Sequence, residues 1–110
     1  MTYRKYGAKK TVVDNVTFAS KHEADDYIHL KFRLRAGEIT DLILQPKFVL
    51  QEGFTHNGKK ERPIHYVADF QYKEDGKDVV ADSKGMRTEV YKIKRKLFLK
   101  LYPQYTFIET

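Results

Sequence analysis

Residues 64–85, IHYVADFQYKEDGKDVVADSKG, form the stretch that decides the predicted fold. In residues 64–72 apolar and polar side chains alternate, which is the period of a strand with one apolar face. The dipeptide Asp75-Gly76 is typical of a tight hairpin turn. After the turn the alternation returns. The stretch therefore predicts a hairpin of two strands.

Both strands of this hairpin carry an acidic side chain among mostly apolar neighbours. Asp69 lies in the first strand and Asp82 in the second, and Lys84 follows Asp82 on the same face, about 6.5–7 Å along the strand. Carboxylates and an ammonium that converge on one sheet face cost free energy unless something compensates them. A divalent cation would do so, and the hairpin therefore predicts a metal site.

Composition limits the classes of protein to consider. A chain of 110 residues suits one domain with a modest core. It contains no cysteine, which excludes disulfides, thiolate metal sites and a cysteine nucleophile. The sequence shows neither a long apolar run nor a signal-type N-terminus, so we expect a cytoplasmic protein. The net charge of +6 favours a polyanionic partner.

The N-terminal residues 1–11 are polar and basic, and they include Lys9 and Lys10. Such a segment is either a solvated tail or an arm that contacts DNA phosphates. We expect residues 12–110 to form a single domain. That domain begins with a short hairpin in residues 12–18, interrupted by a turn after Val13.

Residues 20–36 are predicted to form the first helix, because apolar residues recur at helical spacing and Gly37 follows as a stop. Ser20 and Glu23 have the spacing of a capping box, in which each side chain caps the backbone of the other residue. This structural interpretation of Glu23 stands beside a functional one, a role in the metal site.

Two predicted strands, residues 39–44 and 47–51, flank Gln45-Pro46. Proline cannot donate to a strand ladder, so this dipeptide predicts a bulge, an edge or a corner. Gln45 itself is either a polar residue that ends a strand or one that helps to position the site.

Residues 54–62 contain Asn57-Gly58, a strong hairpin signal, followed by Lys59 and Lys60. These lysines lie either at a solvated loop tip or at a second phosphate contact.

Residues 88–102 are predicted to form the second helix, with Thr88 as N-cap and Pro103 as the stop. The basic face of this helix is either solvated or a phosphate-binding surface. The phosphate-binding interpretation is supported by the position of the helix, which begins close to Lys84 in the chain. A last strand follows in residues 104–108. The side chains expected to form the buried face are Val90, Ile93, Leu97 and Leu101, joined by Tyr91 and Phe98.

Asp69, a turn, and then Asp82-Ser83-Lys84 resemble the PD-(D/E)xK motif of the restriction-endonuclease-like nucleases. Ala68 replaces the leading proline of that motif. The predicted order of elements is similar to the αβββαβ core of this superfamily. The resemblance thus implies an α/β fold in which a central mixed sheet is flanked by two helices.

The chain as a whole also resembles a small phage-encoded family catalogued as a domain of unknown function. A phage origin would place the protein in the cytoplasm of the host cell. The motifs that carry this resemblance are KYGAKKT, SKHEADDY, LQPKFVL, VADFQY, VADSKG and TEVYKIKRKLF.

The nuclease resemblance implies a DNA endonuclease that depends on Mg²⁺ or Mn²⁺. Asp69 and Asp82 would bind the metal, together with Glu23, which falls where many members, including Holliday junction resolvases, carry an extra metal-site glutamate. Lys84 would orient or deprotonate the attacking water, or stabilise the charge of the transition state. The junction resolvases would further imply branched DNA as the substrate and a homodimer. The expected DNA-binding residues are Lys92, Arg95, Lys96, Lys59, Lys60, Lys9 and Lys10.

Two other interpretations stay open. The chain could be a DNA-binding module that keeps the nuclease fold with little or no activity, and only metal dependence would separate that module from an enzyme. It could also be a basic structural or interaction domain, in which Asp69 and Asp82 form surface ion pairs with Lys84 and neighbouring arginines. Such pairs contribute little stability, and this interpretation does not explain acids on inner strands.

Overall fold

The computed structural model describes residues 10–83 and 87–110. Residues 1–9 of the predicted tail lie outside this range, and the first strand begins at Thr11. The elements are β1 (Thr11–Val13), β2 (Val16–Phe18), α1 (Lys21–Arg35), β3 (Thr40–Leu44), β4 (Lys47–Gln51), β5 (Phe54–His56), β6 (Lys59–Glu61), β7 (Ile64–Val67), β8 (Phe70–Glu74), β9 (Lys77–Asp82), α2 (Glu89–Leu101) and β10 (Thr106–Glu109).

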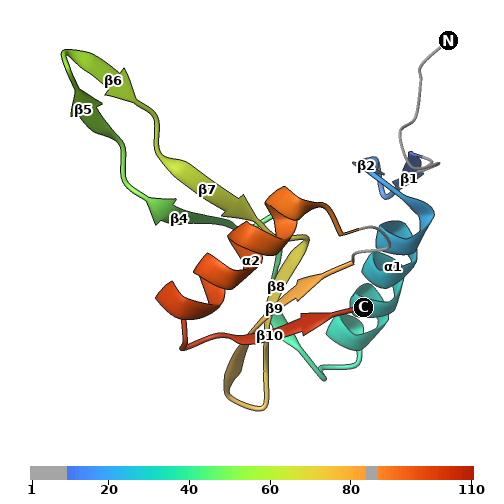
Figure 1. Cartoon of the computed structure of the whole chain (residues 1–110). Helices are drawn as coiled ribbons and strands as arrows, with labels where there is room; N and C mark the ends of the chain where they lie inside the picture. Colours follow the sequence, from blue (N-terminus) through green and yellow to red (C-terminus); the bar gives the residue numbers. More distant parts are fainter. Residues whose placement is uncertain (1–9, 84–86) are drawn as a thin grey trace, which may run out of the picture.

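A four-stranded sheet in the order β10-β9-β8-β3 forms the centre of the molecule (Figure 1). β10 runs parallel to β9, whereas β8 is antiparallel to both β9 and β3, so the sheet is mixed. The turn between β8 and β9 is the predicted one, since Asp75 and Gly76 both have positive φ values, 52° and 77°. Both central residues of a type I′ turn need such values.

The two helices cover opposite faces of this sheet (Figure 1). Side chains alternate across β9, so Val79 and Ala81 join the core cluster that contains Tyr27 of α1. Val80 joins a second cluster that contains Phe98 of α2. The prediction of an α/β fold with a central mixed sheet and two flanking helices is therefore confirmed.

The first helix also agrees with its prediction. Ser20 is the N-cap, and its side chain accepts a hydrogen bond of 3.1 Å from the N–H of Glu23. At the other end Gly37 has a φ of 76°, the left-handed conformation that commonly ends a helix. Within residues 10–83 and 87–110, no helix has the length and apolarity that crossing a membrane requires.

The first strand of the predicted hairpin is shorter than expected. Residues 64–72 form not one strand but two, β7 and β8, which are interrupted at Ala68 and Asp69. The interruption arises because β7 pairs with β4, whereas β8 belongs to the central sheet. Across this corner Ala68 N–H donates to the carbonyl oxygen of Pro46 at 3.1 Å, and Gln45 N–H donates to that of Asp69 at 2.9 Å. Of the bulge, edge or corner that the sequence predicts at Gln45-Pro46, the structure has the corner.

A two-stranded arm, made of β4 and β7 at its base and β5 and β6 at its tip, projects from the central sheet (Figure 1). Every residue of β5 and β6 is exposed. The predicted turn is present, with φ values of 48° at Asn57 and 78° at Gly58. The loop that the sequence predicts to be a hairpin is therefore the tip of this arm.

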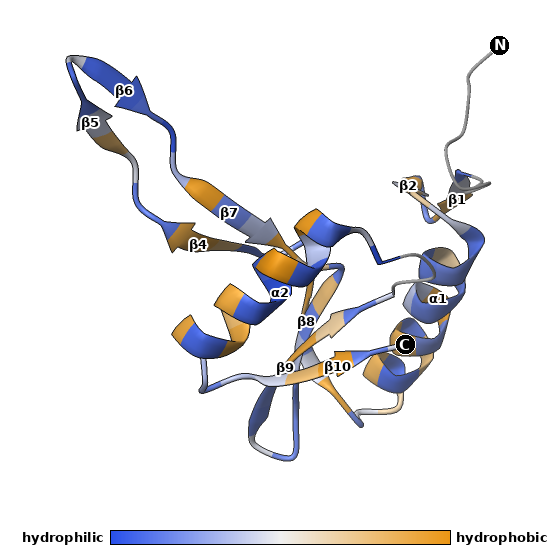
Figure 2. Cartoon of the chain, viewed as in Figure 1, coloured by the Kyte–Doolittle hydropathy of each residue, from blue (hydrophilic) through white to orange (hydrophobic). Residues whose placement is uncertain are grey.

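The prediction of the buried face of α2 is confirmed for Tyr91 and Phe98 and is wrong for Val90, Ile93, Leu97 and Leu101. Val90 is 62 % exposed and Leu97 41 %, whereas Phe98 is 1 % exposed. The Phe98 ring packs 4.8 Å from that of Phe48 and 5.2 Å from that of Tyr66, measured between ring centroids. This aromatic cluster buries more area than the aliphatic residues could, and it turns them outward. Figure 2 shows several hydrophobic residues along α2, and four of them are exposed: Val90, Ile93, Leu97 and Leu101.

Candidate active site

The strands β8 and β9 bring Asp69 and Asp82 together. Phe70 pairs with Ala81 in the antiparallel register, so the residues just outside this pair, Asp69 and Asp82, are neighbours at one edge of the sheet. Asp69 is 9 % exposed and Asp82 0 %. Two buried carboxylates thus lie where the chain leaves the central strands.

The backbone holds the carboxylate of Asp69. Its Oδ2 atom accepts a hydrogen bond of 2.7 Å from the N–H of Ser83, which ties the residue before β8 to the residue after β9. Since backbone atoms make the contact, the direction of this carboxylate is set by the fold rather than by a flexible partner.

A buried phenol holds the carboxylate of Asp82. The hydroxyl of Tyr66 donates to Oδ2 of Asp82. Burial raises the pKa of Tyr66, and the hydrogen bond to Asp82 raises it further. Tyr66 therefore stays protonated and remains a donor, which offsets part of the cost of burying a carboxylate.

Glu23 lies in the first turn of α1 and is 5 % exposed. Within the described ranges 10–83 and 87–110, no three histidine, aspartate or glutamate side chains form a group that could hold a metal ion. The structure therefore places Glu23 inside the molecule without bringing it into a three-ligand group with Asp69 and Asp82. Lys84 lies outside the described residues.

The ligand chemistry of the Asp69–Asp82 pair fits Mg²⁺. Magnesium prefers oxygen ligands, keeps several of its waters and is usually bound through one or two carboxylates. The structure supplies two buried carboxylates oriented by hydrogen bonds, which is how metal-binding carboxylates are generally supported.

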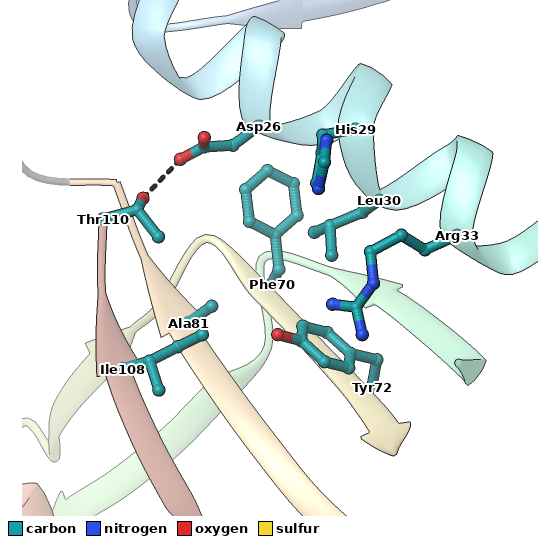
Figure 3. Close-up of a pocket in the computed structure, with 9 residues that line it drawn as sticks. All are labelled: Asp26, His29, Leu30, Arg33, Phe70, Tyr72, Ala81, Ile108 and Thr110. Carbon is teal, nitrogen blue, oxygen red and sulfur yellow. Dashed lines mark hydrogen bonds between the residues drawn. The ribbon is translucent and has the colours of Figure 1, made fainter. Parts of the chain in front are cut away.

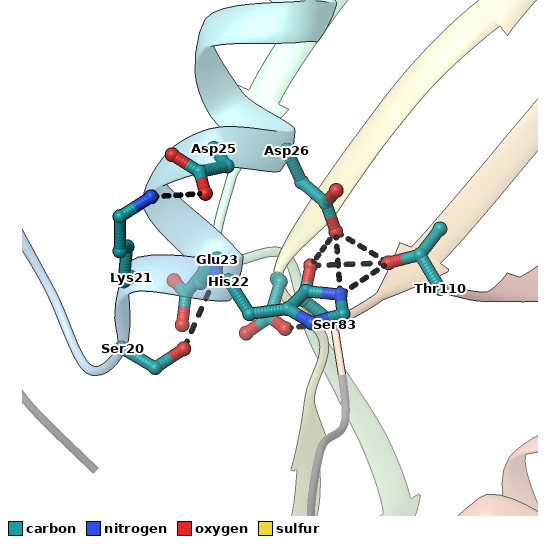
Figure 4. Close-up of polar contacts among 9 residues, drawn as sticks. Ser20, Lys21, His22, Glu23, Asp25, Asp26, Ser83 and Thr110 are labelled. Carbon is teal, nitrogen blue, oxygen red and sulfur yellow. Dashed lines mark hydrogen bonds and ion pairs between the residues drawn. The ribbon is translucent and has the colours of Figure 1, made fainter.

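Sequence reasoning missed Asp26, which links α1 to the site. Its Oδ2 atom accepts hydrogen bonds from Ser83 Oγ at 2.5 Å and from the hydroxyl of Thr110 (Figure 4). His22 Nε2 lies 3.4 Å from the same oxygen. The spacing of three residues after Glu23 could have indicated that Asp26 shares its helix face. Its partners Ser83 and Thr110 could not have been foreseen, because they directly follow β9 and β10, which are distant from α1 in the sequence.

Glu109 of β10 contacts two arginines and a tyrosine on the α2 side of the sheet. It is paired with Asp82 in the parallel register, and its side chain accepts a 2.5 Å hydrogen bond from Tyr91. Arg87 and Arg95 approach its Oε1 atom at 3.5 and 3.3 Å. Arg95, which we expected to contact DNA, thus forms an ion pair within the protein. Arg87 and Glu109 were missed by sequence reasoning.

The other expected DNA-binding residues lie at separate places. Lys92 and Lys96 of α2 line a hollow together with Arg87, which precedes the helix. The ammonium of Lys92 also lies 3.3 Å from the carboxylate of Glu89. Lys59 and Lys60 are exposed at the tip of the arm. Lys10 is exposed just before β1, and Lys9 lies outside the described residues.

Comparison with known proteins gives one match. A family model described as "Protein of unknown function (DUF1064)" matches residues 3–109. The comparison with curated proteins and the comparison with solved structures each found no match.

Proposed function

We propose that this chain, which belongs to the family described as "Protein of unknown function (DUF1064)", is a metal-dependent DNA endonuclease that hydrolyses phosphodiester bonds. The observation that carries the proposal is the pair of buried carboxylates, Asp69 and Asp82, at the ends of neighbouring strands. Lys84 follows Asp82 by two residues.

The order of elements supports the same proposal. Around the central sheet the chain runs α1, β3, β8, β9, α2 and β10. This is the αβββαβ order of the restriction-endonuclease-like core to which the motif is similar, with the arm inserted between the first two strands. Asp69 precedes the second of these strands and Asp82 ends the third, where the motif would place its acids.

Each residue has a role in the proposed chemistry. Asp69 and Asp82 would hold a Mg²⁺ or Mn²⁺ ion, and Glu23 of α1 would accept a hydrogen bond from a water of that ion. The ion would neutralise the scissile phosphate and lower the pKa of water. Lys84 would orient the attacking water or stabilise the negative charge of the transition state.

The test is cleavage of labelled DNA in Mg²⁺, in Mn²⁺ and in EDTA, with four-way junction, flap, single-stranded and linear duplex substrates. We expect cleavage only with metal. Lys84→Ala and Asp82→Asn should each lower the cleavage rate by about 100-fold or more. The matched controls are Lys77→Ala and Asp78→Asn, at the far end of β9, which should cleave like the wild type.

A second candidate is a DNA-binding module with the same fold and little activity. The net charge of +6 suits both candidates, so only metal dependence separates them. Binding without cleavage in either metal would establish this candidate and contradict the first. Neither binding nor cleavage would contradict both.

A further inference from the structure

A cavity of about 120 Å³ lies between α1 and the central sheet (Figure 3). Its floor is apolar, with Phe70 of β8 and Ala81 of β9 almost fully buried. From α1, His29 and Arg33 point toward the strands. Ligand sites generally combine an apolar lining with a few fixed polar groups, and this cavity has both.

The cavity and the candidate active site share two residues. Asp26 and Thr110 line the cavity, and both also contact Ser83, which donates its backbone N–H to Asp69. A molecule in the cavity would therefore lie one hydrogen-bonded residue away from Asp69.

The polar groups of the cavity are held in place by the fold. Arg33 donates from Nε to Glu38 at 3.1 Å and from a terminal nitrogen to Glu74. An arginine has five N–H donors, so these two bonds fix the guanidinium without using all of them. Burial raises the pKa of Tyr72, which keeps its hydroxyl protonated.

We propose that this cavity binds one unpaired nucleobase of a DNA strand whose adjoining phosphate lies at Asp69. A base has apolar faces and carries donors and acceptors along its edge. Asp26 is an acceptor for that edge and Arg33 a donor, while the exposed ring of His29 can stack on a face. This inference rests on the proposed endonuclease function and narrows its substrate.

The preferred class of DNA substrate follows from the free-energy cost of bringing a base into the cavity. A base inside a duplex must first leave its stack and its partner, and that cost is smallest where the base is already unpaired. The preferred substrates are therefore single strands, flaps and branch points rather than continuous duplex.

The test places a larger side chain at the rim of the cavity and measures DNA binding under conditions that prevent catalysis. Ile108→Trp on β10 places a large ring there, and Ile43→Trp on β3, outside the cavity, is the matched control because both isoleucines are exposed. Dissociation constants for a single-stranded oligonucleotide and for the corresponding duplex are measured in EDTA by fluorescence anisotropy.

Ile108→Trp should weaken single-strand binding by about 5-fold or more, the loss expected for one stacked base. Duplex binding should change less than about 2-fold, and Ile43→Trp should change neither. His29→Ala, on the other side of the rim, should act in the same direction and carries the test if circular dichroism shows Ile108→Trp to be unfolded. Unchanged single-strand affinity in the folded variants, or an equal loss on duplex, would overturn the proposal.

Failure here is distinguishable from failure of the endonuclease proposal. Metal-dependent cleavage with no preference for unpaired DNA, together with unchanged single-strand affinity of Ile108→Trp, removes the base cavity and leaves the nuclease. Selective loss of single-strand affinity in Ile108→Trp, together with a wild type that cleaves nothing, leaves the cavity and removes the nuclease.

Discussion

The contact between Tyr66 and Asp82 joins the aromatic core to the candidate active site. Tyr66 lies on β7, outside the central sheet, and packs against Phe98, while its hydroxyl donates to the carboxylate at the end of β9. Removing that donor would leave a buried carboxylate with less support, a change that costs about 1–3 kcal/mol. Tyr66→Phe should therefore destabilise the protein at neutral pH.

The same contact predicts how stability depends on pH. Because burial and Asp82 raise the pKa of Tyr66 above its ordinary value of 10.0, the folded state keeps the phenolic proton where the unfolded chain loses it. The free energy of unfolding contributed by Tyr66 is fully present below pH 10 and falls as the pH rises above it, by about 1.4 kcal/mol per pH unit.

Urea unfolding from pH 8 to pH 11 measures this effect. Tyr66→Phe should reduce the slope between pH 10 and pH 11 relative to the wild type. The remaining slope is expected to come from other buried phenols, such as Tyr91, whose pKa is also raised by burial. A variant that loses stability as steeply as the wild type would contradict the assignment.

At the scale of the element, α2 shows why periodicity alone can select the wrong face. Val90, Ile93, Leu97 and Leu101 recur as regularly as a buried stripe should. Of the six side chains expected to be buried, however, only Tyr91 and Phe98 are. The choice depends on the Phe48 and Tyr66 rings, which the arm supplies.

Truncation of two adjacent residues distinguishes the faces of α2. Phe98→Ala should lower the free energy of unfolding by about 3–5 kcal/mol, because it opens a cavity in the aromatic core. Leu97→Ala should cost less, about 1 kcal/mol, because Leu97 is 41 % exposed and lies outside the aromatic core. Urea denaturation of both variants measures the difference, and equal losses would mean that the predicted stripe is buried after all.

What the sequence could predict was local. The Ser20 cap and the Asp75-Gly76 turn depend on the chemistry of a few adjacent residues, and both are present. The interruption at Ala68 was invisible because the apolar alternation continues through it while the backbone changes sheet. Asp26 was missed for the same kind of reason, since its importance depends on the ends of β9 and β10.

At the scale of the whole molecule, the arm places Lys59 and Lys60 away from the central sheet and its two helices (Figure 1). β5 and β6 pair only with each other in the described sheets, and all of their residues are exposed. An isolated two-stranded ribbon is at best marginally stable in water, so the packing of its own residues does not explain why the arm is present. Binding of phosphates by Lys59 and Lys60 at its tip would explain the arm, if DNA extends along it from the candidate active site.

The salt dependence of DNA binding tests that role of the arm. Each phosphate contact releases counterions, so removing two such contacts by Lys59→Ala and Lys60→Ala should make the slope of log K against log salt concentration shallower by about 2. The control is Lys73→Ala with Lys77→Ala, two exposed lysines near the β8–β9 turn, for which the slope should not change. Cleavage at saturating DNA should also be unchanged, since neither arm lysine touches Asp69 or Asp82. An unaltered slope in the arm variant would mean that Lys59 and Lys60 form a solvated tip, and the DNA would then have to be held by the cations around α2.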